Sequence, residues 1–236
     1  MIGYIGEVTL FAGRLAPKGW LPCNGAVLPI RGNEPLFSLI GGNFGGSFVD
    51  GFALPSIPSP IPNMQVLVCR SGLFPLSRAS DTLGEVKLFA SDRVRTNDSF
   101  ECDGRLLPIP SYAPLFAVMG STFGGNGSSN FAIPRLAAPS GMQYRLGIDG
   151  AFLLAMGMGD QAIGQVRLIA SPTIVPHGWA VCDGRLMPFS FASLYALIGP
   201  RFGIVENSGF RLPNLAPPLA GMRYVIATEG IYAPTS

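Results

Sequence analysis

Three short segments of the chain alternate between apolar and polar residues, and each follows a glycine. They read Gly-Glu-Val-Thr-Leu-Phe-Ala at 6–12, Gly-Glu-Val-Lys-Leu-Phe-Ala at 84–90 and Gly-Gln-Val-Arg-Leu-Ile-Ala at 164–170. In the first segment Val8 and Leu10 face one way, while Glu7, Thr9 and Phe11 face the other. Because a period of two residues is the signal of a half-buried strand, the sequence predicts three equivalent strands, each buried on one face.

Other landmarks recur with the same period. Cys23-Asn24-Gly25, Cys102-Asp103-Gly104 and Cys182-Asp183-Gly184 are 79 and then 80 residues apart. Phe52, Phe131 and Phe210 each open a segment that ends in Leu-Pro or Ile-Pro, at spacings of 79 and 79. A fixed period of this kind indicates tandem structural units. We therefore expect three units at 1–76, 77–156 and 157–236, with links near 76–83 and 157–161.

Each unit contains the same series of predicted elements. The Asn-Gly or Asp-Gly pair between two apolar stretches favours a β-hairpin turn. Residues 35–41, 114–120 and 193–199 predict short helices that end at glycine, with Asn33, Ser111 and Ser190 as candidate caps. A methionine-led strand closes each unit, beginning at Met64, Met142 or Met222, where methionine is expected to fill the core. The fold class is α+β and β-dominant, and we expect the three units to form a pseudo-threefold, single-chain trimer.

A glycine-rich loop of constant length and variable content is the candidate binding element of each unit. It lies between two phenylalanines that are eight residues apart in all three units: 44 and 52, 123 and 131, 202 and 210. Anchored loops with variable tips are typical of binding sites, although a plain connector would have the same pattern. The polar candidates for a receptor or partner are Ser47, Asp50, Asn126, Ser128, Ser129, Asn130, Glu206, Asn207 and Ser208.

Composition points towards an assembly. Charged residues make up 13% of the chain, against about 25% in an average soluble domain, and apolar residues 48%. A surface with so few charges has little electrostatic repulsion towards other protein surfaces, which favours a protein that is part of an assembly. A hydrophobic monomer is the alternative. The net charge of +2, with scattered Lys and Arg, argues against nucleic-acid binding. No apolar run is long enough to span a membrane. The N-terminal residues lack a signal-peptide pattern, so we expect synthesis in the cytoplasm and another route for any export.

Candidate catalytic and metal-binding residues are few. The single histidine, His177, lies in a turn that recurs without histidine, so neither a catalytic base nor a metal site is expected. Asp103 and Asp183 are turn residues, replaced by Asn24 in the first unit. The glycines at 41–46 lack the Gly-Lys-Ser/Thr ending of a phosphate-binding loop. The sequence thus predicts no enzyme, no cofactor and no metal.

The four cysteines show no C-x-x-C pattern, and three hold equivalent positions in the repeat. Buried, free thiols are the expected state, with a Cys23–Cys69 disulfide left open as an alternative.

Taken together, these motifs carry a family resemblance. The order Gly-Glu-Val-x-Leu-Phe-Ala, Pro-x-Gly-Trp-x-x-Cys-Asn-Gly-x-x-Leu-Pro-Ile, Leu-Phe-x-Leu-Ile-Gly and Phe-Gly-Gly…Phe-x-Leu-Pro resembles the phage tail collar domain of short tail fibres and microcystin-dependent proteins. The first unit matches best, from Gly6 to Ile57, whereas the second has Ser99-Phe100 in place of Gly-Trp and the third has Gly203-Ile204 in place of Gly-Gly.

The resemblance implies a non-enzymatic, β-rich component of a fibre tip, on a virion tail or a cell surface, that binds other fibre or collar proteins. Some fibres of this kind hold a metal on the trimer axis through histidines, but this chain has Lys18 where His177 stands in the third unit, so the metal is not carried over. The alternative function is a lectin-like module in which the three variable loops bind a cell-surface glycan.

Overall fold

A computed structural model describes residues 3–47, 49–75, 82–94, 97–150 and 161–232 of the chain. The predicted unit boundaries at 76/77 and 156/157 lie outside these described residues, as do most of the two predicted links. In the described part, strands far outnumber helices, which confirms the β-dominant α+β class.

A nine-stranded sheet, to which each unit contributes three strands, forms the centre of the molecule. In every unit the last strand pairs antiparallel with both the first and the second. The strands are β1 (Glu7–Phe11), β2 (Trp20–Pro22) and β6 (Gln65–Cys69) of unit 1, β7 (Glu85–Phe89), β8 (Ser99–Glu101) and β11 (Gln143–Gly147) of unit 2, and β12 (Gln165–Ile169), β13 (Trp179–Val181) and β17 (Arg223–Ala227) of unit 3.

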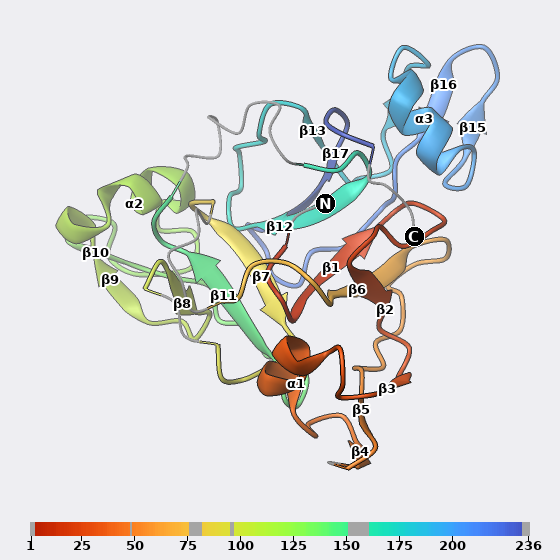
Figure 1. The fold of residues 1–236 in the computed structure, drawn as a ribbon. Coiled ribbons are helices and arrows are strands. Elements are labelled where there is room, and N and C mark those ends of the chain that lie inside the picture. The colour runs from red at the N-terminus through yellow and green to blue at the C-terminus, as the bar shows by residue number, and fades with distance from the viewer. Residues whose placement is uncertain (1–2, 48, 76–81, 95–96, 151–160, 233–236) are drawn as a thin grey trace.

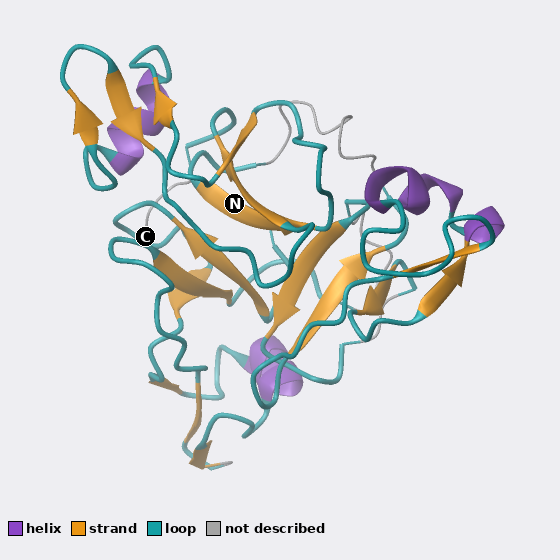
Figure 2. Cartoon of the chain, turned by 180° about the vertical axis from the view of Figure 1, so that it is seen from behind, coloured by secondary structure: helices purple, strands orange, loops and turns teal. Residues whose placement is uncertain are grey.

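An outer part of each unit combines one helix with a small sheet. The elements are β3 (Val27–Leu28), α1 (Glu34–Ile40), β4 (Gly46–Ser47) and β5 (Gly51–Ala53); β9 (Leu106–Pro108), the 3-10 turn η1 (Ile109–Ser111), α2 (Ala113–Met119) and β10 (Asn130–Ala132); and β14 (Leu186–Met187), α3 (Ala192–Ile198), β15 (Ile204–Val205) and β16 (Gly209–Arg211). The three outer parts lie at three corners around β1, β7 and β12 (Figure 1), and the view from behind shows the same arrangement (Figure 2).

The first strands of the three units also pair with one another in a closed ring. The start of β1 pairs with the end of β7, through Glu7–Phe89. The start of β7 pairs with the end of β12, through Glu85–Ile169, and the start of β12 pairs with the end of β1, through Gln165–Phe11. Each first strand is therefore hydrogen-bonded to both of the others as well as to its own last strand.

The hydrophobic cores cross the unit boundaries in the same cyclic sense. The alanine that follows each first strand is fully buried in the core of another unit: Ala90 in that of unit 1, Ala170 in that of unit 2 and Ala12 in that of unit 3. Their amides donate to the carbonyls of Gly6, Gly84 and Gly164, respectively. Units of about 75 residues bury too little surface to be robust alone, so these shared contacts supply part of the stability of each.

The predicted helices are confirmed to within one residue, but their predicted caps are not. Asn33 occupies the N-cap position of α1 without a side-chain cap bond and instead donates to the Pro29 carbonyl at 2.8 Å. The N-caps of α2 and α3 are Tyr112 and Phe191, one residue after the predicted serines. Apolar side chains there pack on the core, which matters more for helices of two turns than capping does.

The Asn-Gly and Asp-Gly turns do not form hairpins, so that prediction is wrong. The strand before the turn pairs within the central sheet and the strand after it within the outer sheet. The side chain of Asn24 accepts a hydrogen bond from the Ala26 amide at 3.1 Å, which closes a local turn, and only Gly25 has a positive φ, of 77°. The chain therefore changes sheets at these turns.

Candidate functional site

The three variable loops lie at the tips of the outer parts, at the three corners of the molecule (Figure 1). Beneath them Phe52, Phe131 and Phe210 are almost fully buried and pack against the helices, as the pattern of paired phenylalanines predicts. The structure thus anchors the predicted loop residues on rigid bases, but it does not bring the three loops together into one site.

In the loop of unit 1, Ser47 and Asp50 bond to each other. The Ser47 hydroxyl donates to Asp50 Oδ2 at 3.1 Å, and the Asp50 amide donates to Ser47 Oγ at 2.9 Å. Val49, beside them, is 88% exposed. The described residues of this tip therefore present an apolar side chain next to a carboxylate.

The loop of unit 2 is ordered by the side chain of Asn126. Its Oδ1 accepts hydrogen bonds from the amides of Ser128, Ser129 and Asn130, at 3.0, 2.8 and 3.1 Å, and its Nδ2 donates to Ser129 Oγ. Because these bonds use most of the polar capacity of Asn126, this residue positions the loop, and the hydroxyl of Ser128 is a better candidate for contacts outside it.

In unit 3 the loop is a β-hairpin with Glu206 and Asn207 at its turn. Asn207 has a φ of 58°, a conformation that asparagine adopts more readily than other side chains. Ser208 donates its amide to the Val205 carbonyl at 3.0 Å, and Ile204 is 47% exposed. Each loop thus presents different chemistry on a similar frame.

A polar cluster at the centre of the ring was not predicted. The second face of the first strands was expected to be exposed, yet Glu7, Thr9, Glu85 and Gln165 are all at least nine-tenths buried. Glu85 forms ion pairs with Arg167 at 3.3 Å and Lys87 at 3.8 Å. Burial would raise the pKa of Glu85, but the two cations outweigh it and hold that pKa below its usual value.

Glu7 responds differently to the same surroundings. Burial raises its pKa, and the nearby Lys87 offsets this only in part. Its Oε2 accepts a hydrogen bond from the Tyr4 amide at 3.0 Å, and the Lys87 ammonium lies 4.7 Å from the centre of the Tyr4 ring. The signal for this cluster was the repeated polar position within the three alternating strands.

A cavity of roughly 200 Å³ lies over the ring. Valines and leucines of the three first strands line it, together with Tyr144 and Tyr224 from two of the last strands and Pro58 and Pro60 from unit 1. Burial raises the pKa of Tyr224 to about 12, so its hydroxyl stays protonated at neutral pH. The cavity is mostly apolar and contains contributions from all three units.

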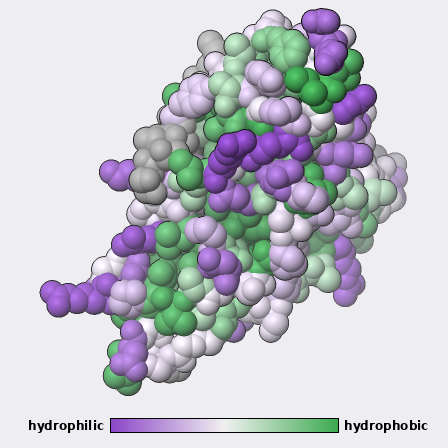
Figure 3. Space-filling view, turned by 90° about the vertical axis from the view of Figure 1, so that its right-hand side faces the viewer, coloured by the Kyte–Doolittle hydropathy of each residue, from purple (hydrophilic) through white to green (hydrophobic). Residues whose placement is uncertain are grey.

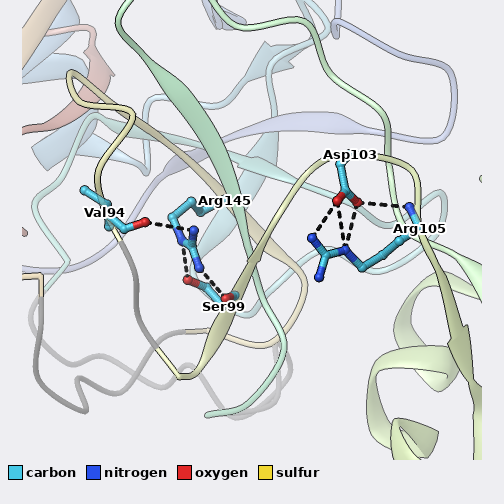
Figure 4. Close-up of polar contacts among 5 residues, drawn as sticks. All are labelled: Val94, Ser99, Asp103, Arg105 and Arg145. Atoms are coloured by element: carbon cyan, nitrogen blue, oxygen red, sulfur yellow. Dashed lines mark hydrogen bonds and ion pairs between the residues drawn. The ribbon is translucent and has the colours of Figure 1, made fainter.

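The loss of Gly-Trp in the middle unit has a structural counterpart. Trp20 and Trp179 are buried, as predicted for structural residues, whereas the strand register of unit 2 puts Ser99, and not Phe100, at their position. Beside it the buried Arg145 donates from Nε to Ser99 Oγ at 2.8 Å and from Nη1 to the Val94 carbonyl at 3.0 Å (Figure 4). Leu67 and Val225 occupy the equivalent position in the other units. The sequence signal for this contact was therefore an arginine at a position that is apolar in the other two copies.

The remaining candidates are the four cysteines and His177. All four cysteines are free and buried, and burial raises the pKa of Cys23 and of Cys102 to about 12. His177 is exposed. Across the described ranges no cluster of three or more His, Cys, Asp or Glu could hold a metal ion, and no helix is long and apolar enough to cross a membrane.

Comparison with curated proteins and with solved structures gave no match. In contrast, the sequence model of the Phage Tail Collar Domain matches three times, over residues 6–61, 84–138 and 164–217. Each match begins at the glycine before a first strand and continues past the outer part of that unit. The three matches cover more than half of the chain, which therefore belongs to the phage tail collar domain family.

Proposed function

We propose that this chain is a single-chain pseudotrimer that forms part of a fibre tip, where it binds other fibre or collar proteins. The collar domain is a structural domain of phage tails and not a family of enzymes. Such a molecule resides on a virion tail or on an extracellular fibre. It presents three similar but non-identical units to a partner that itself has threefold symmetry.

The closed ring of first strands is the observation that carries this proposal. Each unit contributes one strand to the ring, and each strand makes the same two contacts with its neighbours. Three separate chains joined in this way would form a closed, cyclic trimer. Covalent linkage of the units allows their outer surfaces to differ while this trimeric frame is kept.

Exposed apolar residues at equivalent positions support a partner of matching symmetry. Val27, Leu106 and Leu186 each lie four residues after the repeated cysteine, on the outer sheets, and are 63%, 59% and 39% exposed. On the face in Figure 3, hydrophobic residues gather in groups with hydrophilic ones between them. A repeated apolar contact of this kind suits the end of a trimeric fibre.

Native mass spectrometry combined with small-angle scattering tests the proposal. We expect one chain to form a compact triangular particle, and fibre-tip complexes isolated from the native source to contain one copy of this chain for every three copies of a fibre protein. Three separated units, or an elongated particle that joins no complex, would refute it.

A lectin-like role is the second candidate, because the loop tips of units 1 and 3 combine an exposed apolar residue, Val49 or Ile204, with polar groups, and the tip of unit 2 is polar. In unit 2 the Asn126 network holds the hydroxyl and amide groups of 128–130 in fixed positions, which favours recognition of a rigid, polar ligand. A glycan array with the purified chain tests this role. Saturable binding to one sugar that is lost when 126–130 is replaced by the residues at 47–51 would support it, and binding unchanged by that exchange would exclude these loops.

A further inference from the structure

The polar faces of the first strands meet at three junctions of the ring. The registers place the first residue of each strand diagonally opposite the third residue of its neighbour. Side chains at such diagonal positions are within reach of each other when they are long. The three facing pairs are Glu7 with Lys87, Glu85 with Arg167, and Gln165 with Thr9.

The chemistry of these pairs matches at every junction. Two junctions place an acid opposite a base, and the third places an amide opposite a hydroxyl. Glu85 lies 3.3 Å from Arg167, and Lys87 is close enough to Glu7 to oppose the effect of burial on its pKa. At the neutral junction Thr9 Oγ1 donates across the ring to the Val166 carbonyl, next to Gln165, at 3.0 Å.

We propose that these three pairs form a recognition surface that fixes the order of the units in the ring. The partner that fits the polar face of each first strand is the next unit of the same chain, in the order unit 1, unit 2, unit 3. This inference rests on the proposed pseudotrimer and adds a specificity to it.

Other rings lack this match. Three copies of unit 1 would bury Glu7 three times opposite Thr9, without a base. Three copies of unit 3 would bury Arg167 three times, without an acid. A buried charge without its partner strongly destabilises a fold, so both rings are disfavoured.

The reverse order of the units matches the charges less well. Glu7 would then meet Arg167, but Glu85 would meet Thr9 and Lys87 would meet Gln165. Glu85 would lose its 3.3 Å contact with Arg167 and keep only the 3.8 Å contact with Lys87 of its own strand. Only unit 2, with Glu85 and Lys87, satisfies its own charges. The charges therefore disfavour domain exchange that duplicates unit 1 or unit 3 in one ring, but not exchange that duplicates unit 2.

A double-mutant cycle on the full chain at the second junction tests the pairing. We expect Glu85→Gln or Arg167→Thr alone to lower the folding equilibrium constant by about 100-fold or more, because each leaves a buried charge with fewer partners. The double variant copies the neutral junction of Gln165 and Thr9. It should recover at least about tenfold of that loss, since the interaction of neighbouring residues makes their effects non-additive.

The neutral junction provides the matched control. We expect Gln165→Glu to destabilise the chain, because it puts three acids and two bases on the face, and Thr9→Lys to restore stability in that background but to destabilise the wild type. The adjoining cavity, which Thr9 lines, gives the longer side chain room.

The two cycles decide the proposal without reference to the assembly role. Rescue at both junctions, measured by urea unfolding or as recovery of soluble monomer when a single variant does not fold, supports the pairing rule. The rule is overturned if the folding equilibrium constant of each double variant falls by the full product of the two factors measured for its single variants. Scattering by the wild type reports separately on the triangular particle, so the pairing rule can fail while the pseudotrimer stands.

Discussion

Replacement of Arg145 by leucine is the most direct test of how unit 2 compensates for its missing tryptophan. The guanidinium is buried and donates to the side chain and the carbonyl of Ser99 and to the carbonyl of Val94 (Figure 4). These bonds tie β11 to β8 and to the preceding loop. Leucine is the residue that unit 1 has at this position, so the substitution keeps an apolar body and removes only the donors.

The expected loss follows from these contacts. A hydrogen bond to a charged group contributes about 1.5–3 kcal/mol, and three of them are removed. The Val94 carbonyl keeps a donor, because Gln143 Nε2 also binds it at 2.9 Å, and removal of a buried charge offsets part of the loss. We therefore expect Arg145→Leu to lower the free energy of unfolding by about 3 kcal/mol.

Urea unfolding followed by circular dichroism measures this loss, with two comparisons. The double variant Ser99→Trp with Arg145→Leu rebuilds the pair that unit 1 has, Trp20 and Leu67, and should be more stable than the single variant. Arg105→Leu removes an exposed ion pair with Asp103 and should change the free energy of unfolding by less than about 1 kcal/mol. A loss for Arg145→Leu no larger than that for Arg105→Leu would refute the reasoning.

Three further predictions concern acid stability, loop glycines and thiols. The folded-state pKa of Glu85 lies below its usual value of 4.5, so its contribution to stability is present above that pH and is lost as the pH falls. In urea titrations from about pH 5 to about pH 2, the free energy of unfolding should therefore fall less for Glu85→Gln than for the wild type. The folded-state pKa of Glu7 is raised, so its contribution to stability is present at low pH and is lost as the pH rises. Gly41→Ala should lower the free energy of unfolding by about 1–3 kcal/mol through its φ of 56° alone, since a Cβ there meets no atom within 4 Å. In Gly125→Ala the added Cβ meets the Phe131 backbone at 2.5 Å, so this variant should have the lower melting temperature of the two. The four buried thiols should not react with a thiol reagent at about pH 8 until the protein is unfolded, because burial raises their pKa values.

Much of each unit could be predicted because the repeat gives three readings of the same element. The helices, the methionine-led strands and the buried phenylalanines follow local rules of periodicity and glycine placement, and they were predicted correctly. The strand pairing around the Asn-Gly turn was predicted wrongly. The residues of a turn determine its local conformation, but which strands pair on either side of it depends on distant residues. Asn24 closes a local turn in either case, and the sequence has no local mark of a change of sheet.

The polar face of the first strands shows a more general reason for such errors. Alternation in 6–12 predicts which residues share a face, but it attributes the polar face to solvent, because most polar faces are exposed. Here that face is buried where three strands from distant parts of the chain meet, and the cation nearest to Glu85 lies across a junction. Glu85 alone looks like a surface residue, and its role becomes visible only beside Arg167, 82 positions later in the chain. In a homotrimer the same position would be identical in all three units and would carry no information about order. The differences among the three copies at this position therefore match a ring built from unlike units. Such differences are the feature to examine first in other chains that contain tandem copies of one domain.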